Sequence, residues 1–322
     1  MSQSQRKLRR TLSRLLLLAP VSTGMGCAFS STADCKAGTF EQTVRIADLL
    51  LPDGGTPTAD MPCEALCETL AGATGACEFV APVGAGQPDQ VQCEMDAICE
   101  GRRPEGLCSD GAVARTVPVL GALFAKMAHL EAASVPAFER LAEELAAHGA
   151  PARLVRAARR AALEEVRHAR RMTTLAERHG AGLPEVVVAP FGDVRSLEAL
   201  ATENAVEGCV RETFGALLAG WQARGAEDAD VRQALATIAP DELRHAELSW
   251  AIDAWALSQL SPEARARVDA ARQAAWAALE QDAARSTLPG DVARVAGLPS
   301  PEVAQQLVRE LANALRPDVL LA

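Results

Sequence analysis

Apolar residues recur at about every third or fourth position through most of the chain after residue 115, with charged residues between them. This period is that of an amphipathic α-helix. Four long segments follow it, and the pattern predicts helices over 117–147, 152–179, 195–223 and 229–259. Alanine and leucine dominate these segments, and both residues favour helix. We therefore expect an all-α fold.

The breaks between these helices differ in length. The first, "HGAP" (148–151), and the third, "RGAEDAD" (224–230), are short, so each should fold a pair of helices antiparallel. The second break, 179–196, is far longer and holds an extended run, "EVVVAP". Two short loops around one long crossover occur in a known class of four-helix bundles. The pattern predicts such a bundle over 116–260, followed by extra C-terminal helices within 261–322.

Residues 1–27 have the pattern of an export signal. The stretch "RKLRR" supplies positive charge, and a short apolar run that ends in "TGMG" follows it. That run is too short for a membrane span. Cys27 is a candidate for lipidation, and an ordinary cleaved signal is the alternative. We expect an exported protein, in the periplasm or anchored to the envelope by lipid.

Residues 28–112 form a cysteine-rich region with Gly/Pro turns, in which "RIADLLL" and "PCEALCETLAG" are candidate short helices. Eight of the nine cysteines lie between Cys27 and Cys108. Dense cysteines in an exported chain indicate disulfides, and the lack of any CxxC pair argues against a metal–sulfur site. The pairing stays open among the cysteines of this region: Cys35, Cys63, Cys67, Cys77, Cys93, Cys99 and Cys108.

The net charge of the chain argues against one class of partner. The chain has a formal net charge of −10 and no long basic stretch, so nucleic acid is not expected as a partner. Hydrophobic residues make up 49% of the chain, which is enough for a sizeable core.

One motif occurs twice, as "ALEEVRHARRM" (162–172) and as "PDELRHAELSW" (240–250). Each copy contains Glu-x-x-His, and residues three apart share one face of a helix. A glutamate on the preceding helix lies at nearly the same separation in both copies, and Phe138 or Phe214 follows that glutamate at the same distance. Packing the two copies together would converge four carboxylates and two imidazoles. The predicted ligands are Glu131, Glu165, His168, Glu207, Glu242 and His245.

Four buried carboxylates repel one another strongly unless cations lie between them. Two divalent ions would neutralise them, and oxygen with imidazole ligands favours two iron ions or, alternatively, two manganese ions. Glu203, one turn before Glu207, is an additional candidate ligand, whereas Glu212 should point elsewhere and pair with an arginine. The opposing interpretation is that Glu-x-x-His usually lies on a solvated helix face, in a bundle without metals.

On these residues, 117–259 resembles the ferritin-like superfamily and is similar to its rubrerythrin-type members. The resemblance implies a di-iron or di-manganese carboxylate centre that reduces or dismutates hydrogen peroxide or dioxygen. A reductase would need a separate electron donor, because the chain has no paired CxxC motifs; a manganese catalase-like activity would not. Phe138 and Phe214 stand where such proteins often carry tyrosine, so a mechanism that uses tyrosine is not expected.

Several alternatives stay open. Hydroxylation of an organic substrate would need a pocket that the sequence does not reveal. The non-enzymatic alternatives are a metal-binding or storage protein and an envelope scaffold, and a homodimer is compatible with any of them. Pro136 and Pro240 fall inside predicted helices, where a proline removes a backbone hydrogen bond and favours a kink or bulge.

Overall fold

The computed structural model divides the chain into two compact units, residues 1–29 with 99–322, and residues 30–98. Each unit is described by itself. The residues that the structure describes are 3–17, 40–46, 61–67, 73–80, 90–95, 102, 104, 107, 118–188, 191–284, 288 and 290–315.

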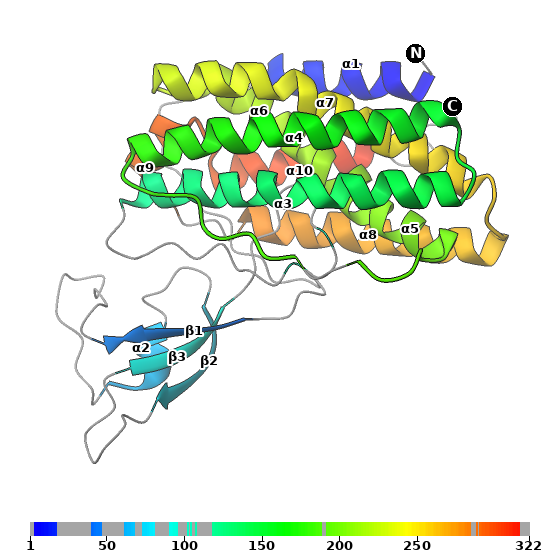
Figure 1. Ribbon diagram of the computed structural model, residues 1–322. Coiled ribbons are helices and arrows are strands. Elements are labelled where there is room, and N and C mark those ends of the chain that lie inside the picture. Colours follow the sequence, from blue (N-terminus) through cyan, green and yellow to red (C-terminus); the bar gives the residue numbers. More distant parts are fainter. Residues whose placement is uncertain are drawn as a thin grey trace. The chain divides into compact units, whose positions relative to one another are not determined.

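The larger unit is a stack of long helices, so the prediction of a mostly helical protein is confirmed (Figure 1). Its first pair is α3 (Val119–Ala147) and α4 (Ala152–Arg178), which pack against each other along their lengths. Helix α6 (Thr213–Gly225) packs in the same way on α7 (Ala229–Leu257), and α7 also contacts α4. The long connection after α4 carries Val188, which forms an isolated antiparallel bridge with Leu107.

The loop residues explain where these helices begin and end. Gly149 after α3 and Gly180 after α4 have φ angles of 70° and 82°, a left-handed conformation that glycine adopts without strain. The Asp228 side chain accepts hydrogen bonds from two backbone N–H groups at the start of α7. Pro136 and Pro240 lie inside the continuous helices α3 and α7.

The main irregularity lies between α5 (Leu197–Glu203) and α6, where the segment η2 (Asn204–Glu212) is a π-helix. Buried side chains hold it: Arg102 donates a hydrogen bond to Asn204 Oδ1 over 2.8 Å, and Asn204 donates one to the Ser249 carbonyl over 2.9 Å. A side chain at Gly208 would collide with Arg102 and Ser249, so glycine is required there. The sequence pattern predicted an unbroken α-helix over this stretch.

The C-terminal extension consists of α8 (Pro262–Ala284), α9 (Gly290–Ala296) and α10 (Pro301–Ala314). The prediction of extra C-terminal helices within 261–322 is thus confirmed. Helix α10 packs on α8. Within the part of the chain that the structure describes, no helix is both long and apolar enough to span a membrane.

Helix α1 (Gln3–Leu17) covers part of this core. Its buried Leu8, Leu12 and Leu15 join the same apolar cluster as Trp250 and Leu311, and Arg9 forms an ion pair with Glu247 on α7. This segment was expected to be an export signal. Its cleavage stays a prediction, and Cys27 lies outside the described residues.

The smaller unit contains a sheet, so the all-α assignment does not extend to the cysteine-rich region. Strands β1 (Phe40–Arg45), β2 (Ala73–Val80) and β3 (Gln90–Met95) form an antiparallel sheet in the order β1-β3-β2. The "RIADLLL" stretch begins inside β1, and α2 (Cys63–Cys67) confirms a helix in "PCEALCETLAG". The sequence predicted none of these strands, because runs of six to eight residues give only a weak periodic signal.

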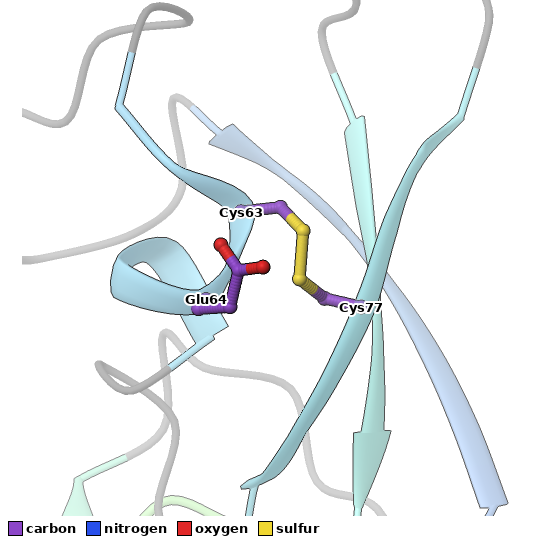
Figure 2. A group of neighbouring side chains, drawn as sticks. All are labelled: Cys63, Glu64 and Cys77. Atoms are coloured by element: carbon purple, nitrogen blue, oxygen red, sulfur yellow. A yellow bond between two sulfur atoms is a disulfide. The ribbon is translucent and has the colours of Figure 1, made fainter.

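A disulfide joins Cys63 at the start of α2 to Cys77 on β2, with a Cα–Cα distance of 6.0 Å (Figure 2). The disulfide prediction is thus confirmed for this pair. The side chains of Cys35, Cys67, Cys93, Cys99 and Cys108 lie outside the described residues. Glu64 stands beside the bridge, but bonded sulfurs cannot act as thiolate ligands, so this trio does not form a thiolate metal site.

Candidate metal centre

The duplicated motifs meet inside the bundle. Two groups of side chains each place one ligand atom per residue within 4.8 Å of the others. Five of the six predicted ligands belong to these groups, and Glu207 does not. The first group is Glu131, Glu165, His168 and Glu242; the second is Glu212, Glu242 and His245.

His168 on α4 directs its Nδ1 atom at three carboxylates. This nitrogen lies 3.0 Å from Oε1 of Glu242, and 3.5 Å from one oxygen each of Glu131 and Glu165. The carboxylates come from three different helices, α3, α4 and α7. Packing of these helices, and not sequence proximity, therefore builds this half of the cluster.

His245 on α7 repeats the arrangement. Its Nδ1 atom lies 2.9 Å from Oε1 of Glu165 and 3.6 Å from Oε1 of Glu242. The two imidazole centroids are 5.8 Å apart, and the Phe138 ring lies 5.1 Å from that of His245. Glu165 and Glu242 each face both histidines, so the two half-sites share their carboxylates.

The outer nitrogen of each histidine contacts a carboxylate from the other copy of the motif. Nε2 of His245 lies 3.0 Å from Oε2 of Glu164, and Nε2 of His168 lies 3.3 Å from Oδ2 of Asp241. A carboxylate only accepts hydrogen bonds, so Nε2 carries the proton in a neutral ring and the Nδ1 lone pair faces the cluster. Metal-binding histidines are commonly held in this way.

The arginine before each histidine completes this arrangement. Arg244 donates to Oε1 of Glu164 over 2.8 Å, and Arg167 to Oδ2 of Asp241 over 3.4 Å. Each arginine thus pairs with the carboxylate that supports its neighbouring histidine. Burial raises the pKa of Glu164, but the hydrogen bonds from His245 and Arg244 prevail and lower it to about 2.

Burial and mutual repulsion shift the pKa values of the cluster residues. Burial, and then the charge of Glu165, raise the pKa of Glu131 well above its usual value. Burial and the charge of Glu242 raise the pKa of Glu212 to about 8. Burial alone would lower the pKa of His168 and of His245, but the surrounding carboxylates prevail and raise both. Positive charge is therefore stabilised at the centre of the cluster.

Several buried polar atoms without a hydrogen-bond partner also lie in this cluster. Among the described residues, the buried atoms without a hydrogen-bond partner of acceptable geometry include Nδ1 of His168, Nδ1 of His245, Oε1 of Glu242 and Oε2 of Glu212. Oε2 of Glu207 is in the same state. Such atoms are rare in protein interiors and cost stability. A set of carboxylate oxygens and imidazole nitrogens fits iron or manganese, because these ions accept both ligand types.

Two other glutamates lie differently from the sequence prediction. Glu203 pairs with Arg195 and, over 3.3 Å, with Arg102, so these arginines and not the cluster engage the proposed extra ligand. Glu207 lies outside both groups, and its Oε1 atom is 3.3 Å from Arg211.

Glu212 was expected to point away from the cluster, and this is wrong. A π-helix has about one residue more per turn than an α-helix, so residues five positions apart lie on the same face. Segment η2 therefore places Glu212 on the same face as Glu207. The Glu212 carboxylate lies in the group with Glu242 and His245, whereas the Glu207 carboxylate is turned toward Arg211. The periodicity of a regular α-helix could not reveal this residue.

Glu164 and Asp241 were also missed as functional residues. A signal was present, because each directly precedes the glutamate of a Glu-x-x-His motif, in "EEVRH" and in "DELRH". The repeat thus extends to an acidic residue before the motif and an arginine within it.

Comparison with known proteins adds no relative. No family model, no curated protein and no solved structure matches this chain. Inference about its function therefore depends on the geometry of its own residues.

Proposed function

We propose that the protein is an exported di-metal carboxylate oxidoreductase of the ferritin-like type, which binds two iron or two manganese ions and reduces or dismutates hydrogen peroxide or dioxygen. One observation carries the proposal. Two buried imidazoles direct unsatisfied Nδ1 atoms at shared carboxylates, while each Nε2 atom contacts an outer carboxylate.

The residues of the cluster are either proposed metal ligands or residues that orient those ligands. Glu131, Glu165 and His168 would hold one ion, Glu212 and His245 the other, and Glu242 belongs to both groups. Two adjacent redox-active ions held there would supply the two electrons that O–O bond cleavage requires. Asp241 and Glu164 fix the ring orientation of the two histidines, and they hold the proton on Nε2.

The residues around the cluster favour a mechanism that uses neither a tyrosyl radical nor a tyrosine proton donor. Phe138 packs on His245 and excludes water from that side, and the chain contains no tyrosine. The Cys63–Cys77 bridge supports an oxidising location. Cysteines bonded in a disulfide cannot bind the iron of an electron-transfer centre. A reductase of this kind would therefore take its electrons from a separate donor protein or small molecule.

The experiment is a metal titration followed by a turnover assay. The purified full chain is loaded anaerobically with Fe(II) or Mn(II), bound ions are counted by elemental analysis, and peroxide consumption is then measured with and without a reductant. We expect two ions per chain. Iron-dependent turnover with a reductant would indicate a peroxidase or oxidase, and manganese-dependent turnover without one a catalase.

A paired variant makes this test specific. E165A/H168A should lose stoichiometric binding and keep its helical circular dichroism, whereas E177Q, an exposed glutamate on the same helix, should behave as the parent. Binding of two ions by E165A/H168A would refute the ligand assignment. Two ions without any turnover of peroxide or dioxygen would refute the oxidoreductase and leave a binding protein.

A further inference from the structure

A second feature lies on the outer side of His245. A cavity of about 230 Å³ opens between α4 and α7, with α1 contributing Arg9 to its lining. His245 and Glu164, which belong to the histidine–carboxylate pair described above, line one end of it. None of the roles assigned to the metal centre requires this space.

The walls of the cavity are apolar. Leu154 and Ala157 line it from α4, and Leu248 and Ala251 line it from α7. An apolar cavity of about 150 Å³ is large enough to hold benzene. The space here is larger, so it can accommodate a ring-sized organic body in contact with these four side chains.

The remaining lining is charged, and most of the charges are already paired. Arg9 forms an ion pair with Glu247, and Arg244 forms one with Glu164 over 2.8 Å. The two acidic side chains in the lining are therefore neutralised within the protein. They add no net negative charge that would repel an anion.

Two arginines of the lining remain for a ligand. No ion pair joins Arg153 to another described residue, and Arg160 has only a long contact of 3.7 Å with Glu164. Both lie on α4, on either side of Ala157, so positive charge borders the apolar wall. Guanidinium groups bind carboxylates through paired, charge-assisted hydrogen bonds.

We propose that this cavity binds a small carboxylic acid with an apolar body, of about the size of benzoate. Its body packs on Leu154, Ala157, Leu248 and Ala251, and its carboxylate pairs with Arg153 and Arg160. The ligand then lies against Glu164, the group that holds His245. This site is separate from the proposed oxidoreductase function, because its binding groups exist without metals.

The test is calorimetric titration of the metal-free full chain with benzoate, with benzyl alcohol as the neutral analogue and inorganic phosphate as the anion without an apolar body. We expect benzoate to bind, and R153Q/R160Q to weaken its binding about tenfold or more, the effect of losing charge-assisted hydrogen bonds. R156Q/R159Q is the matched control, because Arg156 and Arg159 are exposed on the same helix and do not line the cavity.

A filling variant tests the apolar wall. A157L should abolish benzoate binding by occupying the cavity, and its circular dichroism should match that of the parent. The proposal is overturned if benzoate does not bind, if R153Q/R160Q binds it as the control does, or if phosphate binds as tightly as benzoate and A157L has no effect. Because no metal is present, none of these outcomes bears on the ion count that tests the proposed function.

Discussion

Glu164 on α4 contacts His245 on α7 over 3.0 Å, although its own motif supplies His168. Asp241 makes the reciprocal contact from α7 to His168 over 3.3 Å. Each copy of the motif therefore supports the histidine of the other copy. Neither helix can orient its own imidazole alone, so the geometry of the cluster depends on correct packing of α4 on α7.

The crossed contacts predict that the outer carboxylates tune metal affinity. E164Q or D241N should weaken binding of Fe(II) or Mn(II) about 10- to 100-fold, because a histidine that loses its carboxylate partner is a poorer and less well-oriented ligand. Competition with a chelator measures this affinity. E177Q is the exposed control on α4, and unchanged affinity in both E164Q and D241N would show that the contacts do not support the ligands.

The π-helical segment predicts that Glu212, and not Glu207, supplies a ligand. E212Q should reduce the number of bound ions from two to one, whereas E207Q should keep both, because only Glu212 lies in the group with Glu242 and His245. Elemental analysis after anaerobic loading distinguishes them. The two variants make the same substitution in the same segment, so a loss of metal in E207Q alone would reverse the assignment.

A buried ion pair predicts how stability depends on pH. Burial raises the pKa of Glu144, but hydrogen bonds and charge from Arg195 prevail and lower it below its usual 4.5. A carboxyl whose pKa falls on folding stabilises the protein above the unfolded pKa, and this contribution is lost as the pH falls through the folded value. E144Q should therefore cost about 2 kcal/mol near pH 7, because Arg195 keeps its ion pair with Glu203, and less in acid.

Urea unfolding of the metal-free protein at neutral pH and at about pH 3 measures this difference. The Glu144 and Arg195 side chains are joined over 2.6 Å, and Glu144 is 2% exposed. E139Q, which changes an exposed glutamate on the same helix, is the control. A penalty for E144Q that stayed constant or grew in acid would contradict the assignment.

The disulfide predicts that the smaller unit is stabilised by a local cross-link. Cys63 and Cys77 are separated by 14 residues, and closing a loop of this size is worth about 3 kcal/mol. C63A/C77A should make residues 30–98 sensitive to protease, with little change in the melting of the helical unit. Limited proteolysis with mass spectrometry tests this, and equal resistance of parent and variant would count against it.

Much of the helical unit could be predicted from sequence because its segments are long and strongly periodic. Helices 117–147 and 229–259 match α3 and α7 within about two residues. Glu131 and Glu165 were identifiable because a duplicated spacing is visible in the chain itself. The contact between Glu164 and His245 was not, because it depends on how two distant helices face each other.

Other features were hidden for different physical reasons. Glu212 reaches the cluster only because buried Arg102 and Asn204 support a π-helix, and local propensity does not encode such long-range support. Helix α1 was interpreted as an export signal, and its buried leucines show that such a pattern also suits packing on a core. Strand β1 was missed because six residues give too short a period.

The two halves of the cluster are unequal, even with the ligand that the π-helical segment adds to the smaller one. One group offers four ligand atoms and the other three, and Glu242 belongs to both. Two ions would therefore not compete for equivalent places. The first ion would bind in the four-ligand half. The second would bind in the other half, where Glu242 already coordinates the first ion. Loading should proceed in two resolvable steps, with a species that carries a single ion per chain populated when metal is limiting.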